Sequence, residues 1–325
     1  MKIKTHDLAI ILLNYNGSTD TIECIESIDK QKTSRNYSVF ILDNGSANTD
    51  YLTLVNYFNK REDYQLTTYT SDLQVNADMN YFIRSEKNFG FAKGNNNVIR
   101  LVMDKFKYVV LLNNDTIVDE RFVDIMIDFL ASNSHIKYAS CRINNYYDRS
   151  LLWNCGGKVL WWGNKHYFTE KELENKEKNV KTSFISGCAL FLDTLMLKEM
   201  GLLSEDFFHG EEDFNFCWRM KAAKIPGYCL KETLVYHKIS VSSKKGGVKN
   251  GKIAGYYANR IIDMHKFYPT LIWEIWRRML VFYVVIDCIR KHVGFGNIKD
   301  IVKLINKYAY NTQLTYEDCI EMKRF

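Results

Sequence analysis

Short polar segments follow three apolar runs in the first part of the chain, and their side chains could bind a charged ligand. The segments are Asn-Tyr-Asn-Gly at 14–17, Asp-Asn-Gly-Ser at 43–46 and Asn-Asn-Asp-Thr at 113–116. Asn, Asp and Gly also form turns, which would explain any one segment by itself. In an open parallel sheet, however, ligands bind outside the carboxyl ends of the strands. Three strands that end alike therefore favour a single ligand-binding cleft.

Two motifs that the sequence lacks narrow the choice of ligand. There is no G-x-G-x-x-G after the first apolar run and no G-x-x-x-x-G-K-[ST] anywhere, so neither a dinucleotide fingerprint nor a P-loop is indicated. A bound diphosphate would then need a divalent cation to neutralise its charge. Mg²⁺ and Mn²⁺ prefer oxygen ligands and share them with phosphate groups. Asp115, which follows an apolar run, is the candidate ligand.

A second cluster of carboxylates, Glu211–Asp213, precedes the segment FNFCWRM. Acidic residues in a first helical turn stabilise the helix by about 0.3–1 kcal/mol each, which would explain one or two of them. Three in a row after His209-Gly210 suggest that one carboxylate accepts a proton from an attacking hydroxyl. His237 ends an apolar segment, as Asp115 does. A lone histidine is more often structural than a ligand, but a metal shared with Asp115 is geometrically feasible.

Strand and helix patterns alternate around these segments. The apolar runs at 8–13, 39–42 and 108–112 suit strands that are buried on both faces of a parallel sheet. Ser18 can cap the helix that follows the first run. Further helices are expected around 98–102 and 122–130 and from 211 onward, and further strands at 187–192 and 227–236. The pattern predicts an α/β fold with a Rossmann-like, mostly parallel sheet flanked by helices.

The composition of the chain changes near residue 240. Residues 1–240 are expected to form the sheet domain, and residues 241–325 a linker with a C-terminal helical segment. Ser242–Lys252 is rich in Ser, Gly and Lys and is the candidate linker. Within the first domain, Gly156–Thr182 is charge-dense in part and is expected to be a mobile surface loop or an exposed helix.

The net charge of +6 is concentrated at the C-terminal end, where residues 241–325 hold 15 basic and 7 acidic residues. Such a segment suggests contact with an anionic membrane surface, although a solvated helical face would look the same. Its aromatic and basic residues fit an amphipathic surface helix, but packing on the rest of the chain or in a homodimer fits them equally. They are Trp273, Trp276, Phe282, Tyr283, Arg277, Arg278, Arg290 and Lys291.

Three features predict a cytoplasmic protein. No two of the eight cysteines have C-x-x-C spacing, and several lie in apolar runs, which suits buried thiols in a reducing compartment. The N-terminal sequence lacks the apolar stretch of a signal peptide. The longest apolar stretch near the C-terminus, Met279–Ile289, has 11 residues and contains Asp287, which is too short to span a bilayer.

Seven segments, in their order along the chain, resemble the family 2 glycosyltransferases with the GT-A fold, and among these the rhamnosyltransferase-like branch. The resemblance covers about residues 7 to 270. The segments are LAIILLNYNG, VFILDNGS, SEKNFGFAKGNN, VVLLNNDT, FISGCALFL, LLSEDFFHGEEDFNFCWRM and ETLVYHKIS. Their joint occurrence is far more specific than any one of them.

The resemblance implies a role for each matched residue. Asp213 would be the catalytic base, with Glu212 beside it in the E-D motif, and Asp115 and His237 would bind Mg²⁺ or Mn²⁺. The donor-binding residues would be Asn14, Tyr15, Asn16, Asp43, Asn44, Asn88, Gly90, Gly94, Asn95, Asn113 and Asn114. The acceptor-side residues would be Ser186, Gly187 and Trp218. Asn113 replaces the first Asp of the family's D-x-D motif, and Asn215 replaces a later Asp.

The implied activity is inverting transfer of a sugar from a UDP- or dTDP-linked donor to a hydroxyl of a glycan or lipid-linked acceptor, in cell-surface polysaccharide synthesis. The Q-x-x-R-W signature of processive synthases is missing, which favours addition of one or a few sugars. No motif indicates nucleic acid as a partner. One alternative is a sugar-nucleotidyltransferase, which the lack of a basic residue in NYNGSTD disfavours. Another is an inert nucleotide-sugar-binding scaffold, which Asn113 and Asn215 would permit.

Overall fold

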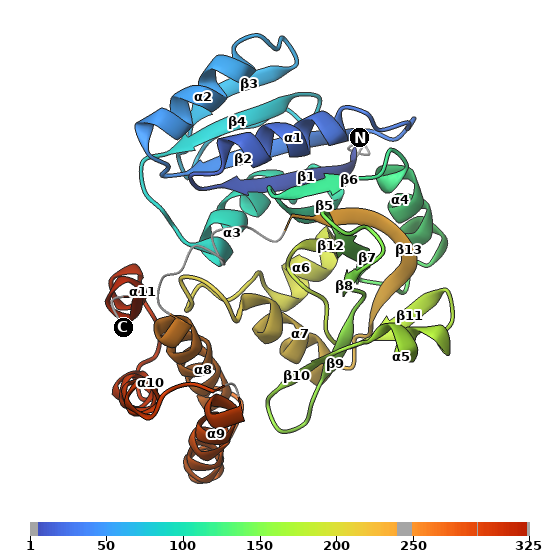
Figure 1. Ribbon diagram of the computed structural model, residues 1–325. Coiled ribbons are helices and arrows are strands. Elements are labelled where there is room, and N and C mark those ends of the chain that lie inside the picture. Colours follow the sequence, from blue (N-terminus) through green and yellow to red (C-terminus); the bar gives the residue numbers. More distant parts are fainter. Residues whose placement is uncertain (1–5, 239–248, 291, 324–325) are drawn as a thin grey trace.

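The computed structural model describes residues 6–238, 249–290 and 292–323. A sheet lies between helices, and the C-terminal helices gather at one side of it (Figure 1). The strands are β1 (His6–Asn14), β2 (Tyr37–Asn44), β3 (Tyr64–Thr68), β4 (Asn80–Ser85), β5 (Phe106–Asn113), β6 (Thr116–Val118), β7 (Tyr138–Asn145), β8 (Leu152–Asn154), β9 (Gly157–Val159), β10 (Lys165–Tyr167), β11 (Asn179–Thr182), β12 (Ala189–Asp193) and β13 (Gly227–His237). The helices are α1 (Ser18–Ile28), α2 (Asn48–Phe58), α3 (Phe91–Val102), α4 (Phe122–Ser132), α5 (Glu170–Glu174), α6 (Thr194–Met200), α7 (Glu212–Ala222), α8 (Lys249–His265), α9 (Thr270–Arg290), α10 (Phe295–Tyr308) and α11 (Tyr316–Lys323).

The main sheet is mixed, with a wholly parallel half and a half that combines antiparallel pairs with the parallel pair β7–β13. Its strands lie in the order β11-β13-β7-β12-β5-β1-β2-β4-β3. From β5 to β3 every neighbouring pair is parallel. On the other side β12 runs antiparallel to both β5 and β7. The predicted fold class, a mostly parallel sheet flanked by helices and followed by a helical extension, is confirmed.

The parallel register brings the three expected polar segments together. Asn14 on β1 lies opposite Asp43 on β2, and Leu13 lies opposite Asn113 on β5. Because parallel neighbours run in the same direction, their carboxyl ends meet at one edge of the sheet. The polar residues therefore line a common edge, as their positions after the apolar runs predict.

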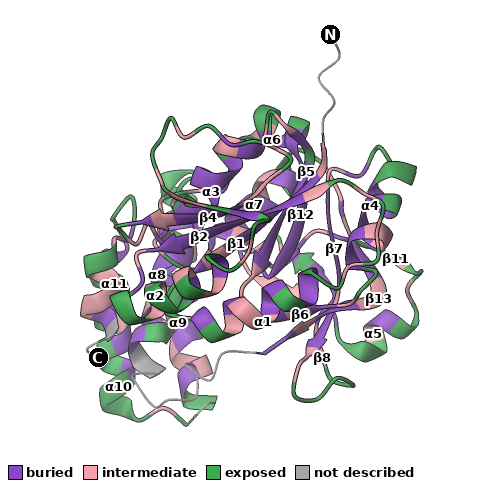
Figure 2. Cartoon of the chain, turned by 90° about the horizontal axis from the view of Figure 1, so that it is seen from above, coloured by how far each residue is buried: buried purple, intermediate pink, exposed green. Residues whose placement is uncertain are grey.

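Strand β1 shows why the sheet carries helices on both faces. Ile11 belongs to a hydrophobic cluster with residues of α3 and α7, whereas Ile10 belongs to a second cluster with residues of α1 and α4. Both side chains are fully buried, and Figure 2 shows the purple, buried strands between helices whose outer faces are exposed. Burial on both faces explains why this strand is a continuous apolar run.

Three local expectations need correction or refinement. Ser18 begins α1 but does not cap it: Gly17 occupies the N-cap position, and the Ser18 amide donates to Asp50 Oδ1 at 2.8 Å. The stretch at 156–182 contains β9, β10, β11 and the helix α5, which has a capping box between Thr169 and Glu172. Residues 242–248 of the candidate linker lie outside the described residues, and α8 already begins at Lys249.

The C-terminal helices pack against the sheet domain. Residues of α8, α9 and α10 share one hydrophobic cluster with α3 and α7. Trp273 is fully buried and donates its indole N–H to the carbonyl of Ile261 at 2.9 Å. Arg277 is buried as well, so these two residues do not belong to an amphipathic outer surface of α9. Trp273 therefore packs on the rest of the chain and does not face outward as a membrane-surface residue would. Among the described residues, no helix is long and apolar enough to cross a bilayer.

Candidate active site

Asn14 is the centre of a hydrogen-bond network at the carboxyl end of β1. Its buried amide donates to Asp43 Oδ1 at 2.8 Å, to Ser46 Oγ at 3.1 Å and to Asp50 Oδ2 at 3.0 Å. Its Oδ1 accepts a bond of 2.9 Å from the hydroxyl of Thr21. The side chain of Asn14 therefore positions the neighbouring turn, and its polar atoms are already bonded within the protein.

The residues that follow Asn14 are accessible. Tyr15 and Asn16 are both exposed, and Asn16 has a positive φ of 54°. Asn16 Oδ1 accepts a 2.8 Å bond from the amide of Ala47, which fixes the turn. The neighbouring Tyr15 raises the pKa of Tyr316, so α11 lies beside this turn. Phe208 packs against Tyr316 with ring centroids 4.9 Å apart.

Asp43 is fully buried and forms an ion pair with Arg84 of β4. The Arg84 guanidinium also donates to the Ser46 carbonyl at 3.1 Å and lies 4.3 Å from the ring centroid of Tyr51. A buried carboxylate needs such a partner, because an uncompensated charge in the interior is strongly destabilising. Arg84 is thus part of this end of the sheet, although the sequence did not point to it.

Asn44 connects β2 with the loop before α3. Its Nδ2 donates to Asn88 Oδ1 at 3.0 Å and to the Gly90 carbonyl at 3.1 Å, and its Oδ1 accepts from the Phe89 amide at 2.9 Å. Asn88 Oδ1 in turn accepts from the Gly90 amide at 2.8 Å. The expected donor residues Asn44, Asn88 and Gly90 therefore lie together, held by one another.

The remaining expected residues of this segment have clear packing roles. Gly90 has φ of 78°, and a Cβ there would lie 2.2 Å from the carbonyl oxygen of Phe208. A Cβ on Gly94 would lie 2.8 Å from a methyl group of Leu13, so α3 can approach β1 only because this residue is glycine. The buried Asn95 donates its side-chain amide to the backbone carbonyl one turn earlier in α3.

The segment at 113–115 turns its three residues in different directions. The backbone amide of Asn113 donates to the carbonyl of Cys188 at 2.9 Å, next to β12. The side-chain amide of Asn114 donates to Thr21 Oγ1 at 2.9 Å, toward α1. Asp115 points to the end of β13 instead, where its Oδ1 lies 3.1 Å from His237 Nε2.

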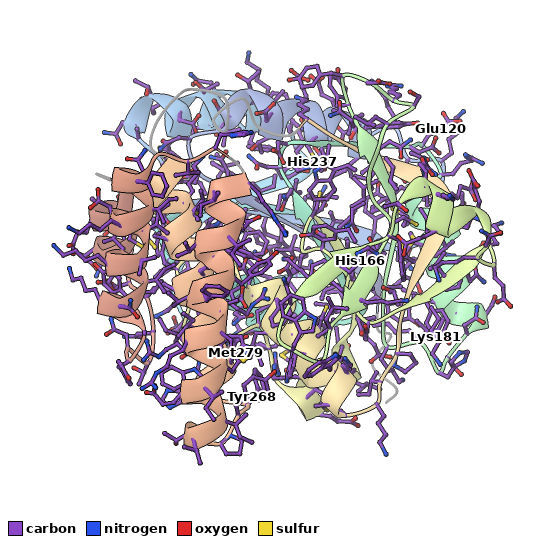
Figure 3. The ribbon with its side chains drawn as sticks, turned by 60° about the horizontal axis from the view of Figure 1, so that its bottom comes forward. Glu120, His166, Lys181, His237, Tyr268 and Met279 are labelled. Carbon is purple, nitrogen blue, oxygen red and sulfur yellow. The ribbon has the colours of Figure 1, made fainter. Side chains whose placement is uncertain are left out.

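The Asp115–His237 pair brings together two residues that are 122 positions apart. Both side chains are largely buried, at 15% and 10% exposure. The imidazole packs edge-on against Trp153 with ring centroids 4.4 Å apart, and its Nδ1 has no hydrogen-bond partner among the described residues. Nearby, the Lys238 ammonium is bound by Asp20 at 2.7 Å and by Glu23 at 2.6 Å. In Figure 3 His237 lies among the strands, away from Met279 on the helical side.

Asp115 and His237 could supply two ligands to a cation whose other ligands come from a bound diphosphate and water. Carboxylate oxygen and neutral imidazole nitrogen both bind Mn²⁺, and the observed 3.1 Å between Asp115 Oδ1 and His237 Nε2 lets both face one ion. Within the described ranges, no group of three or more His, Cys, Asp and Glu side chains could hold a metal by itself. A diphosphate and water would have to complete the coordination, as is usual for Mg²⁺-type sites.

Glu211, the first residue of the acidic cluster at the start of α7, is held by the C-terminal helix α8. Glu211 adopts a left-handed φ of 84° at the N-cap position. Its carboxylate, fully buried, forms an ion pair with the buried guanidinium of Arg260 on α8. Arg260 also donates to the carbonyl of Gly163 at 2.6 Å and lies 3.5 Å from the ring centroid of Phe214. The conformation of this loop thus depends on a residue almost fifty positions away.

Glu212 and Asp213 differ in their surroundings. Burial, with the charge of Asp213 as a second cause, raises the pKa of Glu212 to about 8, so this carboxyl is largely protonated at neutral pH. Asp213 is partly exposed, and its Oδ1 lies 3.4 Å from the ammonium of Lys165 on β10. Burial lowers the pKa of Lys165, but the charges of Asp213, Tyr167 and Glu211 outweigh this effect and raise it. Of the two neighbouring acids, Asp213 is the one suited to accept a proton.

The strand end at Asn113 and the first turn of α7 at Asp213 both approach the turn at 186–188. The carbonyl of Cys188 accepts from the amide of Asn113, two residues before Asp115. A Cβ on Gly187 would lie 3.8 Å from Cβ of Asp213. Ser186 Oγ accepts from the amide of Cys188 at 3.3 Å, which stabilises the turn. The structure therefore brings Asn113, two residues before Asp115, and Asp213 to the same short segment from two different elements.

Two further residues of α7 face the C-terminal helices. Trp218, an expected acceptor-side residue, packs against Phe267 and Tyr268 with centroid distances of 5.7 and 6.2 Å. Asn215 donates to Asp263 Oδ1 at 2.5 Å, and burial raises the pKa of Asp263 to about 7. Asn215, which stands where the family often has an acid, thus forms part of the contact between α7 and α8.

Three residues of the site were missed at the sequence level: Arg84, Lys165 and Arg260. Arg84 follows the apolar run at 81–83, so the strand-end pattern that marked the other segments would have found it. Lys165 and Arg260 carry no such signal, because only the tertiary fold places them beside Asp213 and Glu211.

Two solved structures share this arrangement of the sheet. One is a crystal structure of GalNAc-T7 with UDP, GalNAc and Mn²⁺, at a TM-score of 0.61 and 12% identity over 98% of this chain and 56% of that one. The other is the mannosyltransferase PcManGT from Pyrobaculum calidifontis with GDP-Man and Mn²⁺, at 0.55 and 11%, over 98% of this chain and 79% of that one. The fold is therefore the GT-A fold of glycosyltransferases. The chain spans little more than half the length of the GalNAc-T7 chain.

The sequence itself assigns the family. The profile of glycosyl transferase family 2 matches residues 9–199, which is more than half of the chain. The chain therefore belongs to glycosyl transferase family 2. No curated protein sequence matches it.

Proposed function

We propose that this protein is an inverting glycosyltransferase that moves a sugar from a nucleotide-diphosphate sugar, UDP- or dTDP-linked, to a hydroxyl of a glycan or lipid-linked acceptor. The rhamnosyltransferase-like branch and a role in cell-surface polysaccharide synthesis belong to the same proposal. The observation that carries it is a family 2 fold in which Asp115 pairs with His237 at the strand ends while Asp213, next to the turn at 186–188, pairs with Lys165. One is suited to the diphosphate and the other to the acceptor.

The donor would lie across the carboxyl ends of β1, β2 and β5. Exposed Tyr15 offers an aromatic face for the base, and the turn that carries it is fixed by Asn14. Asp43 and Arg84 together present a buried ion pair rather than a free carboxylate at this edge. We therefore assign Asn14, Asp43, Asn44 and Asn88 to shaping the donor site, with backbone groups and Tyr15 closest to the nucleotide.

The chemistry is a single displacement at the anomeric carbon. The acceptor oxygen forms a bond to that carbon, its proton passes to Asp213, and the bond to the nucleoside diphosphate breaks with its electron pair. A divalent cation held by Asp115 and His237 would supply positive charge to the departing diphosphate. Lys165, 3.4 Å from Asp213, orients the carboxylate. Glu212, kept neutral by burial, adds no second charge beside it.

A thermal-shift panel of UDP, dTDP, GDP and CDP with and without Mn²⁺ tests the donor side. We expect one uridine- or thymidine-type nucleotide to stabilise the protein in a Mn²⁺-dependent way. Asp115→Ala and His237→Ala should each raise the Mn²⁺ concentration needed for this stabilisation at least tenfold. Asp104→Ala, an exposed acid paired with Lys198, is the matched control and should change nothing. An unaltered Mn²⁺ response in Asp115→Ala would remove the metal assignment.

Product analysis separates the alternatives. Release of a nucleoside diphosphate together with a glycosylated alcohol supports the transferase, whereas free pyrophosphate would identify a nucleotidyltransferase. Nucleotide binding without any product across a panel of donors and alcohols would identify an inert scaffold. Asn113, which removes one acid from the usual metal motif, is the residue that makes the inert alternative worth testing.

We also propose that the protein is cytoplasmic and that α9 docks on the anionic inner face of a membrane, near a lipid-linked acceptor. The support is an outward row of apolar side chains at helical spacing, with Arg278 exposed beside it. The row consists of Leu271, Ile272, Ile275, Met279 and Phe282. Flotation with phosphatidylglycerol vesicles tests it, and Met279→Glu should abolish binding. If the protein does not float with the vesicles but dimerises as its concentration rises, the apolar row on α9 is instead a homodimer interface.

A further inference from the structure

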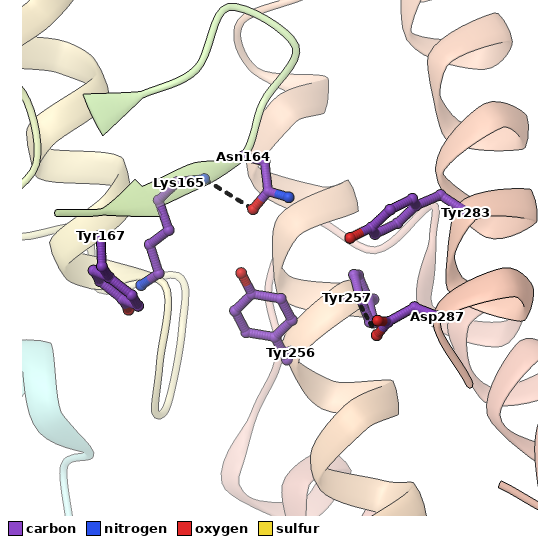
Figure 4. Close-up of a pocket in the computed structure, with 7 residues that line it drawn as sticks. All are labelled: Asn164, Lys165, Tyr167, Tyr256, Tyr257, Tyr283 and Asp287. Atoms are coloured by element: carbon purple, nitrogen blue, oxygen red, sulfur yellow. Dashed lines mark hydrogen bonds between the residues drawn. The ribbon is translucent and has the colours of Figure 1, made fainter. Parts of the chain in front are cut away.

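A cavity of about 370 Å³ lies between the β9–β10 hairpin and the helices α8 and α9. Four tyrosines line it: Tyr167 from β10, Tyr256 and Tyr257 from α8, and Tyr283 from α9. Figure 4 shows these rings around a shared space, with Tyr256 opposite Asn164 and Lys165 and Tyr257 beside Asp287. The volume falls in the range of small-molecule pockets, roughly 300–1,000 Å³. Nothing in the proposed donor site uses this cavity.

The cavity adjoins the proposed base. Lys165 lines it and at the same time places its ammonium 3.4 Å from Asp213 Oδ1. The same ammonium lies 4.5 Å from the ring centroid of Phe184, two residues before Ser186. A molecule in the cavity therefore lies against Lys165, the side chain that pairs with Asp213.

The lining selects for a neutral, hydroxyl-rich ligand. Lys165 and Asp287 contribute one charge of each sign, so a phosphate or a carboxylate gains from one and is repelled by the other. A lipid tail would cover polar lining groups such as Asn164 and the hydroxyl of Tyr256 without hydrogen bonding to them, which is costly. A sugar ring satisfies both requirements, because its C–H faces pack on aromatic rings and its hydroxyls bond to amides, carboxylates and phenols.

We propose that this cavity binds a pyranose ring of the acceptor glycan and directs one of its hydroxyls toward Asp213. The inference rests on the proposed glycosyltransferase function and deepens it. Tyr256, Tyr283 and Asp287 lie beyond the family-matched region, which ends at residue 199. The C-terminal helices thus supply acceptor recognition, while the matched region supplies the donor site.

Saturation-transfer NMR on the whole chain tests the cavity directly. The probes are the methyl α- and β-pyranosides of glucose, galactose, mannose, N-acetylglucosamine and L-rhamnose, added without any donor. We expect at least one of them to bind, and Tyr256→Ala and Tyr283→Ala to weaken it at least tenfold. Phe295→Ala, which removes an exposed ring on α10 outside the cavity, is the matched control and should leave binding within twofold. Asp287→Asn keeps the shape of the side chain and should weaken binding less than either tyrosine change.

A parallel thermal shift with UDP or dTDP and Mn²⁺ distinguishes the two proposals. Loss of glycoside binding in Tyr256→Ala and Tyr283→Ala, with the nucleotide shift intact, supports the acceptor site. Glycoside binding that survives both changes, or a nucleotide-competent protein that binds none of the glycosides, overturns the acceptor site and leaves the proposed function standing. A protein that responds to no nucleotide contradicts the proposed function, whatever the glycosides do.

Discussion

The proposed donor edge, at the carboxyl ends of β1, β2 and β5, and the environment of α7 are built in different ways. At this edge, Asn14, Asp43 and Asn44 lie at the carboxyl ends of β1 and β2 and bond to one another's strand or to the loop before α3. Around α7, Glu211 is held by Arg260 and Asp213 by Lys165, across 49 and 48 positions of sequence. The first region consists mainly of strand-end motifs, with one buried ion pair between Asp43 and Arg84, whereas in the second region both Glu211 and Asp213 depend on long-range ion pairs.

This difference indicates where function can vary. A site made of strand ends keeps its geometry as long as the sheet forms, because the register fixes which residues are neighbours. A site that depends on ion pairs with α8 and β10 changes whenever those elements change. We infer that donor chemistry is fixed by the fold, whereas acceptor recognition depends on the helical extension.

The largest expected effect comes from Asp213→Asn. Removal of the proposed base should lower transfer by about 10³-fold, within the range for general-base catalysis, while nucleotide binding changes less than twofold. Paired transfer and nucleotide thermal-shift assays measure both. Asp206→Asn removes a surface acid that pairs with Lys266 and should keep near-normal transfer. Normal turnover in Asp213→Asn would show that another group takes the proton.

Arg260→Met tests the long-range support of the α7 loop. The change leaves the buried Glu211 without its partner and should lower the free energy of unfolding by roughly 3–5 kcal/mol. Urea denaturation measures it. The double variant Glu211→Gln with Arg260→Met should recover part of the loss, because no charge remains unpaired. Lys307→Ala, which breaks the exposed pair with Glu321, should cost less than about 1 kcal/mol. A similarly small loss in Arg260→Met would contradict the role given to this pair.

The pH dependence of stability tests the burial of Glu212. Its pKa is raised from 4.5 to about 8 in the folded protein. Between these two pH values, the folded state therefore holds a proton that the unfolded state has released. The stabilisation is complete below about pH 4.5, the ordinary value, and is lost as the pH rises through 8. Between pH 5 and 8.5 this group should lower the unfolding free energy by roughly 2–4 kcal/mol.

Glu212→Gln should flatten this slope in urea titrations at several pH values. The pKa of Asp263 is raised to about 7 mainly by burial, which gives a pH dependence of the same sign. A smaller slope should therefore remain in Glu212→Gln. Glu317→Gln, at an exposed acid of α11, is the control and should keep the wild-type slope. An unchanged slope in Glu212→Gln would mean that water reaches this carboxyl.

Gly90→Ala probes the donor edge with the smallest expected effect. The left-handed φ and the carbonyl of Phe208, 2.2 Å from the new Cβ, should together cost about 2–3 kcal/mol of stability. Gly294→Ala meets no atom within 4 Å and should be near neutral. Thermal denaturation compares the two, and equal melting temperatures would refute the close approach at Gly90.

The sequence by itself determined the sheet and its polar edge. Runs such as LAIILL are apolar throughout because both faces of β1 are covered, and this property is visible without coordinates. The polar residues after these runs then predicted that the three strand ends meet at one edge, and the register bears this out, with Asn14 opposite Asp43 and Asn113 opposite Leu13. The helical C-terminal region was predicted equally well from its pattern.

Only the tertiary structure decided how charges and aromatic rings are shared between distant elements. The buried pairs Arg84–Asp43 and Arg260–Glu211 need the folded sheet and the docked α8, and helical spacing could not show that Trp273 faces inward while Met279 faces out. The physical reason is that the spacing of apolar residues shows only which face of a single element is apolar. The partner of a buried charge depends instead on which elements pack together.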